Sequence, residues 1–274
     1  MSKINRRDFL SLSAMAGAAA IVGTSPILSS CSSEKGAKMV PLRAKGEYYV
    51  PELMDKAIDG RELKVGLVGC GGRGTGAIMN LLDAANGITV AAYGDVFADR
   101  IDSCRKIVSE KYGQDVPDDK VFVGFDAYKK VIDSGIDMVI LTTPPVFRPT
   151  QFEYAVEKGV HAFLEKPIEV DAKGYRQIMA ASRQAKAKGL SVVTGTQRHH
   201  QRPYVEAYQK VQEGMIGEIT GGAVYWNQGM LWYKDRQPGW SDMEWNIRDW
   251  VNWKWLSGDH IVEQHVHHIA VFLW

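Results

Sequence analysis

The sequence predicts an α/β fold built on a doubly wound parallel sheet. Short apolar segments alternate with segments of helical spacing from residue 63 to residue 194, as expected when helices join the strands of a parallel sheet. The unbroken apolar run 138–141 is typical of a strand that is buried on both faces. Three glycines, Gly69, Gly71 and Gly74, follow the first predicted strand directly. In such sheets a ligand crevice lies at the carboxyl ends of the strands.

Each element follows from its own residue pattern. Strands are predicted where apolar and β-branched residues run together, at 63–68, 88–95, 121–123, 138–141, 161–164 and 191–194. Helices are predicted where apolar residues recur every three or four positions, at 77–85, 98–112, 127–134, 151–158 and 172–188. Further along, we expect a strand over 219–226, a long loop over 228–246, and a helix that carries Glu263 and His267 on one face.

Length and charge exclude some classes of protein. The 274 residues suffice for one large or two ordinary domains, and 45% hydrophobic with 24% charged residues is typical of a folded protein. The formal net charge is only +1, with 33 basic and 32 acidic side chains. Because nucleic-acid binding requires a basic excess or patch, no nucleic-acid partner is expected.

The N-terminus has the pattern of an export signal. Arg6 and Arg7 precede a moderately apolar stretch over residues 9–28, which resembles a twin-arginine (Tat) signal, and residues 28–31 resemble a lipoprotein lipobox that ends at Cys31. Residues 1–31 are therefore predicted to direct export, with membrane contact only through a lipid anchor on Cys31, and residues 32–60 to form a linker. The protein is expected in the periplasm or as a membrane-anchored lipoprotein. A plain membrane span is the alternative, but glycine, serine and proline interrupt the apolar run.

The glycine pattern predicts a dinucleotide site. Gly69 permits a tight turn, Gly71 lets the backbone approach a pyrophosphate, and Gly74 lets the following helix pack closely on the strand. Asp95 ends the second predicted strand, where its carboxylate suits a ribose and repels a 2′-phosphate, so NAD is favoured over NADP. Since the Tat route exports folded proteins, the cofactor is expected to be tightly bound. The alternative is a structural glycine turn beside a solvated Asp95.

Several motifs in order resemble the Gfo/Idh/MocA oxidoreductases: residues 68–74, 142–145, 161–167 with Glu-Lys-Pro, 195–198, and the acid-x-x-x-His pair. The resemblance implies a Rossmann-type domain over 61–197 and an α+β open-sheet domain over 198–274. That second domain is expected to be truncated, and the full-length protein is expected to be a homo-oligomer. The implied cofactor-binding residues are Gly69, Gly71, Gly72, Arg73, Gly74, Asp95, Thr143, Pro144, Glu165 and Lys166.

The same resemblance implies a catalytic group made of Lys166, Glu263 and His267. A lysine at a strand end, beside a nicotinamide and apolar walls, suits proton exchange with a substrate hydroxyl. His267 would hold or relay that proton with support from Glu263. Further candidates for substrate binding, with weaker support from the motifs, are Arg198, Tyr225 and Trp226.

Three positions depart from the family pattern. Glu263 stands where an aspartate is usual, and His265 replaces a glycine. Arg148 replaces a histidine, and it is expected to bind an acidic substrate, bind a cofactor phosphate, or cap the next helix. The Lys166–Pro167 peptide bond is a candidate for the cis form.

Two alternatives concern the histidine-rich end and the tryptophans. His260, Glu263 and His267 share a helix face and offer the ligands of a possible metal site, although no metal is assigned. The alternative is that this histidine-rich helix belongs to an ordinary interface. Seven of the 8 tryptophans lie between Trp226 and Trp255, where their rings suit either sugar faces or packing.

The sequence therefore predicts an NAD-dependent oxidoreductase that transfers hydride between a nicotinamide and a hydroxyl of a sugar, polyol or sugar derivative. One alternative is an NAD-dependent glycosidase that acts by transient oxidation and elimination. The other is a non-catalytic sugar-binding lipoprotein on the same fold.

Overall fold

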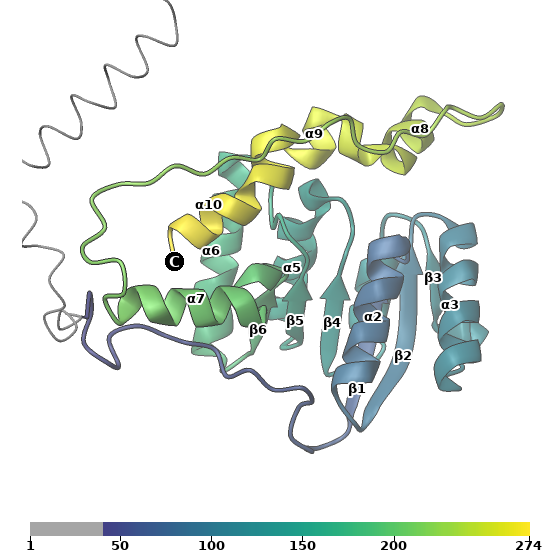
Figure 1. Ribbon diagram of the computed structural model, residues 1–274. Coiled ribbons are helices and arrows are strands. Elements are labelled where there is room, and N and C mark those ends of the chain that lie inside the picture. The colour runs from purple at the N-terminus through teal and green to yellow at the C-terminus, as the bar shows by residue number, and fades with distance from the viewer. Residues whose placement is uncertain (1–40) are drawn as a thin grey trace, which may run out of the picture.

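The computed structural model describes residues 41–274. The predicted signal, Cys31 and the first part of the predicted linker lie outside the described residues. Six parallel strands form one sheet in the order β3-β2-β1-β4-β5-β6 (Figure 1). The strands are β1 Leu63–Val68, β2 Ile88–Asp95, β3 Val121–Val123, β4 Met138–Leu141, β5 His161–Leu164 and β6 Val192–Thr194. The predicted doubly wound α/β fold is confirmed.

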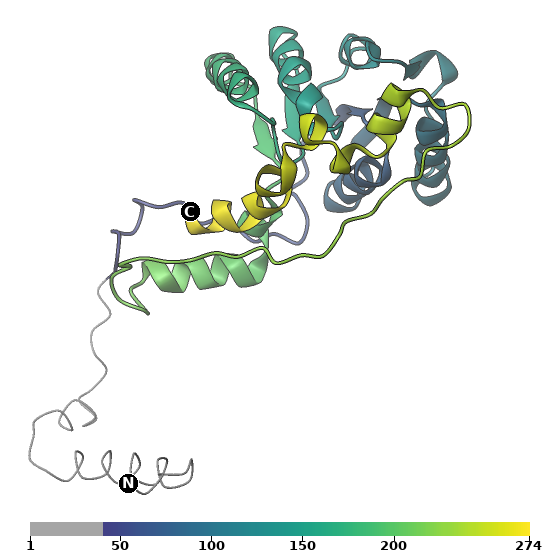
Figure 2. The same ribbon diagram turned by 90° about the horizontal axis from the view of Figure 1, so that it is seen from above.

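Helices cover both faces of this sheet (Figure 2). One core lies between the sheet and α2 with α3, and the other between the sheet and α4, α5 and α6. These helices are α2 Gly72–Ala84, α3 Ala98–Tyr112, α4 Ala127–Ile132, α5 Arg148–Glu157 and α6 Ala172–Ala187, with short 3-10 turns at Asp118–Lys120, Pro145–Phe147 and Gln197–His200. Strand order reverses at β1 and β4, so the crevice expected at such a switch point lies at the carboxyl ends of these two strands.

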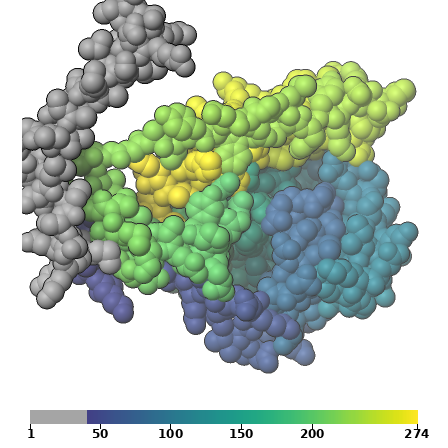
Figure 3. Space-filling model, in the orientation of Figure 1, coloured from purple at the N-terminus to yellow at the C-terminus, as the bar shows by residue number. Residues whose placement is uncertain are grey.

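The C-terminal part of the chain crosses that end of the sheet (Figures 1 and 3). After α7 Arg202–Gln212 the chain runs in irregular extended form, and helical segments then follow in close succession. They are α8 Asp242–Arg248, a 3-10 turn Trp250–Asn252, α9 Lys254–Ser257, a π-helical turn Ile261–His265 and α10 Val266–Phe272. Within residues 41–274, no helix is long and apolar enough to cross a membrane.

The predicted strand over 219–226 is wrong. This segment is extended, but in residues 198–274 there is no strand for it to pair with, so the expected open sheet has no strand there. Histidine side chains take up its carbonyl groups instead. His265 Nε2 lies 3.2 Å from the Val224 oxygen and His268 Nδ1 lies 2.7 Å from the Tyr225 oxygen. Residues that favour strands form one only where a neighbouring strand supplies the hydrogen-bonded ladder.

Candidate active site

The glycine-rich turn between β1 and α2 lies so close to the segment after β4 that side chains on the turn would not fit. Gly69 has a φ of +94°, and a Cβ on it would lie 2.7 Å from the backbone nitrogen of Thr143. A Cβ on Gly74 would collide with the Gly69 carbonyl oxygen and lie 2.7 Å from Thr142 Oγ1. The Thr142 hydroxyl in turn donates to the Gly69 oxygen at 2.6 Å. The turn therefore requires glycine at both positions and leaves the start of α2 open to a ligand.

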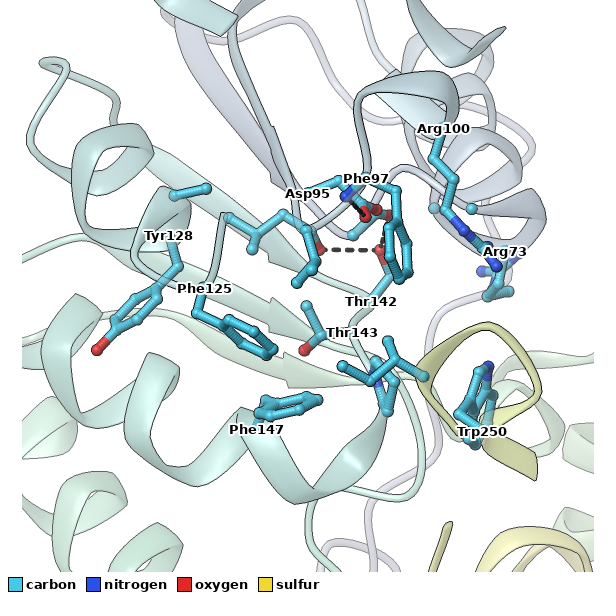
Figure 4. A pocket seen from close by; sticks show the side chains of 18 of the residues that line it. Arg73, Asp95, Phe97, Arg100, Phe125, Tyr128, Thr142, Thr143, Phe147 and Trp250 are labelled. Carbon is cyan, nitrogen blue, oxygen red and sulfur yellow. Dashed lines mark hydrogen bonds between the residues drawn. The ribbon is translucent and has the colours of Figure 1, made fainter. Parts of the chain in front are cut away.

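A cavity of about 370 Å³ lies over this turn (Figure 4). Arg73 and Arg100 lie side by side at one end of it, and Phe125 and Phe147 lie next to each other elsewhere along its wall, with ring centroids 6.1 Å apart. The predicted cofactor-binding residues that line the cavity are Gly69, Gly71, Gly72, Arg73, Gly74, Asp95, Thr143 and Pro144. Glu165 and Lys166 are not among its lining residues.

Asp95 lies at the carboxyl end of β2, beside the glycine turn. Its Oδ2 accepts a hydrogen bond from the Cys70 N–H at 2.6 Å, and its Oδ1 accepts one from the Phe97 N–H at 2.9 Å. Burial raises the pKa of this carboxyl, while the two N–H groups and the nearby Arg100 guanidinium oppose the rise. Asp95 thus holds the turn in shape, and each oxygen retains a lone pair for a further hydrogen bond.

Arg100 is a cavity residue that sequence reasoning missed. Its Nη1 would lie 2.6 Å from a Cβ on Gly71, so the guanidinium lies directly over the glycine turn. It also lies 5.8 Å from the centre of the Phe97 ring. Arg100 follows Asp95 by five positions in the first turn of α3, and this proximity is the pattern that could have revealed it.

The C-terminal segment forms one wall of the cavity, through Trp232, Lys234, Ile247 and Trp250. The Lys234 N–H donates to Asp249 Oδ1 at 2.8 Å, which ties the extended chain to the end of α8. Partial burial and the guanidinium groups of Arg100 and Arg248 lower the pKa of Lys234. The cavity therefore gathers positive charge from both parts of the chain, which suits a ligand with phosphate groups.

Arg248 joins this wall to the sheet domain. Its Nη1 and Nη2 donate to the two carboxylate oxygens of Asp99 in α3 at 3.0 and 2.9 Å, and its Nε donates to Glu244 at 2.9 Å. The guanidinium also lies 3.8 Å from the centre of the Phe97 ring. Because Asp99 and Phe97 flank the cavity mouth, this pair holds the wall in place.

Replacing Arg248 with alanine is expected to speed cofactor release about fivefold, since an ion pair with one exposed partner contributes up to about 1 kcal/mol. Stopped-flow measurement of NADH release, followed by fluorescence, tests this. Arg105→Ala is the matched control, because Arg105 forms a similar pair with Asp118 and does not line the cavity. Equal release rates for the Arg248 variant and the control would contradict this role of the wall.

The second part of the site centres on Lys166, which follows β5. Lys166 Nζ donates to Glu263 Oε1 at 2.8 Å and to the Glu263 carbonyl oxygen at 2.6 Å. Both acceptors come from the π-helical turn, whose wider coil presents a side chain and a carbonyl of one residue to the same partner. Burial raises the pKa of Glu263, and the charges of Lys166 and then Arg148 oppose the rise. The Lys166–Pro167 peptide bond is cis.

His267 lies near this pair and is 8% exposed. Burial lowers its pKa to about 4, and the charges of Lys166, Arg198 and His268 add to the effect. The Trp226 ring stacks on His267 with centroids 5.4 Å apart, and the Arg198 guanidinium lies 5.1 Å from the Trp226 ring centre. His267 is therefore a neutral imidazole at physiological pH, able to accept or donate a hydrogen bond.

The buried neutral His267 predicts a loss of stability in acid. Its folded pKa of about 4 lies below the unfolded value of about 6.5, so between these pH values the unfolded chain binds the proton and stability falls as pH falls. In His267→Gln, the difference between the free energies of unfolding at pH 7 and pH 5, measured with urea, is expected to be smaller than in the wild type. The exposed His200→Gln should leave that difference unchanged. An unchanged difference in His267→Gln would contradict the assignment.

Glu165 lies between the two parts of the site. Arg73 Nε donates to Glu165 Oε1 at 2.6 Å, which links the glycine turn to the Glu-Lys-Pro segment. A Cβ on Gly195 would lie 2.8 Å from Glu165 Oε2, so glycine is needed there to admit the carboxylate. Two residues predicted to contact the cofactor thus contact each other, and they place Lys166 next to the cavity.

Not all residues predicted to bind the substrate lie near Lys166. The Tyr225 side chain is 69% exposed, and this residue instead supplies its carbonyl to His268. The tryptophans do not form one sugar-binding surface: Trp232 and Trp250 line the cavity, Trp245 packs edge-on against Trp253, and only Trp226 stacks on His267. Across residues 41–274 there is no group of three His, Cys, Asp or Glu side chains placed to hold a metal ion.

Comparison with known proteins identifies the sheet domain. The family described as oxidoreductases with an NAD-binding Rossmann fold (GFO/IDH/MocA) matches residues 63–196. The sheet domain is therefore similar to the NAD-binding Rossmann domain of that family. This domain contains both the glycine turn and the Glu165-Lys166-Pro167 segment, whereas Glu263 and His267 lie beyond the matched residues.

The curated proteins that are similar to this chain carry two kinds of name. A glycosyl hydrolase family 109 protein of Shewanella pealeana is 24% identical over 84% of this chain and 47% of its own length. A scyllo-inositol 2-dehydrogenase (NAD(+)) of Bacillus subtilis is 26% identical over 57% of this chain and 42% of its own length. The chain spans about half the length of the curated relatives it matches.

The fold of the chain also matches solved structures. The apo scyllo-inositol dehydrogenase of Lactobacillus casei aligns with a TM-score of 0.56 at 21% identity, over 79% of this chain and 56% of that one. This likeness supports the architecture described above, with the parallel sheet and the segment that follows it.

Proposed function

We propose that this protein is an NAD-dependent oxidoreductase that transfers hydride between a nicotinamide and a hydroxyl-bearing carbon of a sugar, polyol or sugar derivative. The observation that carries the proposal is the Lys166–Glu263 pair beside the neutral His267, next to a cavity over a glycine turn. This arrangement joins a dinucleotide site to proton-transfer groups, which is what oxidation of an alcohol requires.

The residues present fit a dinucleotide. Glycine at positions 69 and 74 leaves a cradle that a Cβ would fill, and Arg73, Arg100 and Lys234 add positive charge near it. Asp95 suits the two ribose hydroxyls of NAD, since its oxygens each have a lone pair left. The wall that carries Trp232 and Trp250 supports tight binding. When bound, the nicotinamide supplies the hydride donor or acceptor.

The chain's own residues handle the proton. Lys166 takes the proton of the reacting hydroxyl, and Glu263 compensates the resulting ammonium charge at 2.8 Å. Glu263 Oε2 is buried and has no hydrogen-bond partner in the described part of the chain, so it is available to a substrate hydroxyl. His267 hydrogen-bonds the same hydroxyl, with Trp226 restricting its orientation. Arg198 Nε donates to the Tyr204 hydroxyl at 3.0 Å, and this bond holds the guanidinium over the Trp226 ring.

The proposal is tested on protein purified from an exporting host. Mass spectrometry after denaturation is expected to show NAD, and not NADP, in near-stoichiometric amount. With NAD bound or added, a panel of inositols, aldoses and N-acetylated sugars is expected to contain a substrate that raises the absorbance of the reduced nicotinamide. Failure to retain or bind either dinucleotide would contradict the proposal.

A second candidate is an NAD-dependent glycosidase that acts by transient oxidation, elimination and re-reduction. It is supported by the relatives named glycosyl hydrolase family 109. Release of sugar from a nitrophenyl glycoside without net formation of reduced nicotinamide would favour it. Sugar binding without either reaction would instead favour a non-catalytic sugar-binding lipoprotein.

We also propose that the N-terminal segment exports the protein and anchors it by a lipid on Cys31, and that the protein is a homo-oligomer. The support for export is the Arg6-Arg7 motif and the sequence 28–31, and the homo-oligomer is what the resemblance to the Gfo/Idh/MocA oxidoreductases implies. Radiolabelled palmitate is expected to enter the wild type and not Cys31→Ser. Mass measurement by light scattering tests the oligomer.

A further inference from the structure

Arg148 begins α5 and is a buried cation beneath the Glu-Lys-Pro segment. It is 3% exposed. Its Nη1 donates to the Glu165 carbonyl at 2.8 Å and also to the Pro167 carbonyl. These two carbonyls lie on either side of Lys166 in the chain. The side chain is thus turned inward, and the expected roles in binding an acidic substrate or a cofactor phosphate, or in capping a helix, do not fit its contacts.

A buried guanidinium requires compensation, because leaving water costs a charged group several kcal/mol. Three carboxylates act on it: those of Glu263, Glu165 and Glu169. Burial lowers the pKa of Arg148 to about 10, so the group stays charged at physiological pH. One cation therefore serves both the backbone around Lys166 and the carboxylate that pairs with Lys166.

Glu263 is faced by charged groups from several elements. Lys166 from the segment after β5 and Arg148 from α5 favour its ionised form, while Glu165 disfavours it. Arg148 is not one of the residues that line the cavity, yet it is positioned to influence both members of the Lys166–Glu263 pair.

We propose that Arg148 is a positioning residue: it clamps the two carbonyls that flank Lys166, and its charge stabilises the carboxylate partner of that lysine. The catalytic consequence rests on the proposed function, whereas the structural claim does not. Both hydrogen bonds come from one nitrogen, Nη1, whose two N–H groups have fixed directions in the guanidinium plane, whereas the ammonium of a lysine rotates at the end of a flexible stem.

Titration of Glu263 tests the proposal without a substrate. The full chain is labelled with ¹³C at glutamate carboxyl carbons, and the Glu263 signal, assigned with Glu263→Gln, is followed against pH by NMR. In Arg148→Met the midpoint is expected to rise, because the variant lacks a buried positive charge that favours the ionised form of Glu263. Arg148→Lys keeps the charge and is expected to stay near the wild-type midpoint.

Val131→Ala is the matched control for a loss of stability alone, because Val131 is fully buried in the same core and far in sequence from the Glu-Lys-Pro segment. It is expected to lower stability and leave the Glu263 midpoint unchanged. If Arg148→Met does not fold, Arg148→Gln replaces it, since glutamine keeps a donor and removes the charge. A Glu263 midpoint that stays at its wild-type value in a folded neutral variant overturns the proposal.

Turnover separates this inference from the proposed function. If wild-type protein oxidises a polyol, Arg148→Met is expected to lower kcat at least tenfold with the NAD dissociation constant within threefold of wild type. A kcat equal to wild type in that variant overturns the catalytic consequence. If the wild type lacks turnover altogether, the proposed function fails, while the NMR titration still decides the role of Arg148.

Discussion

Replacing Lys166 with methionine is expected to reduce turnover by about 10²- to 10⁴-fold, the range usual for loss of a general acid–base group. Lys166 Nζ is proposed to exchange a proton with the reacting hydroxyl, while Glu263 compensates its charge at 2.8 Å. The dissociation constant for NAD should change by no more than a few-fold, because Lys166 does not line the cavity over the glycine turn. Steady-state kinetics and equilibrium binding measure the two effects separately.

Lys173→Met is the control for this variant, since Lys173 is an exposed lysine in the first turn of α6. Its turnover is expected to equal that of the wild type. Turnover of Lys166→Met within threefold of the control would remove Lys166 from the mechanism. A parallel loss of NAD binding would show instead that the lysine serves the cofactor.

Replacing Gly74 with alanine is expected to weaken NAD binding at least 100-fold. The added Cβ collides with the Gly69 carbonyl oxygen and lies 2.7 Å from Thr142 Oγ1, so the turn and the start of α2 must separate. These are backbone and buried groups that cannot move aside as a flexible side chain would. The turn would then lose the geometry that directs its N–H groups at phosphates.

Gly76→Ala is the matched control two positions further along α2. Gly76 does not line the cavity, and the atom nearest to a Cβ there is Arg73 Nη1 at 3.4 Å, the end of a flexible side chain. We expect NAD binding close to wild type and a gain in stability of about 0.5–1 kcal/mol, the usual difference between alanine and glycine inside a helix. Isothermal titration of both variants with NAD measures the contrast. Equal affinities for the two variants would contradict the role assigned to the turn.

The sheet could be predicted because its signals are local. Each of the six predicted strands between residues 63 and 194 lies within about one residue of an observed strand, since a buried parallel strand is an apolar run bounded by turns. The glycine turn was legible for the same reason: Gly69 and Gly74 are close in sequence, and their spacing alone determines what the backbone can approach.

The contacts that build the site could not be predicted, because they join distant residues. Arg73 meets Glu165 and Lys166 meets Glu263 across more than ninety positions. A helix was expected at Glu263, but the π-helical turn that brings its side chain and carbonyl to Lys166 has no pattern in the residues. The segment 219–226 is rich in residues that favour strands, such as isoleucine, threonine, valine, tyrosine and tryptophan, but it lacks a partner strand, so the local signal there is not matched by its tertiary context.

The central claim is that hydride passes directly between substrate carbon and a nicotinamide held over the glycine turn. Incubation of the NAD-loaded protein with a substrate deuterated at the reacting carbon, followed by mass spectrometry of the extracted nucleotide, tests it most directly. The account predicts deuterium on the nicotinamide ring in the wild type and almost none in Lys166→Met. Product formation in the wild type without any deuterium on the nucleotide would contradict it.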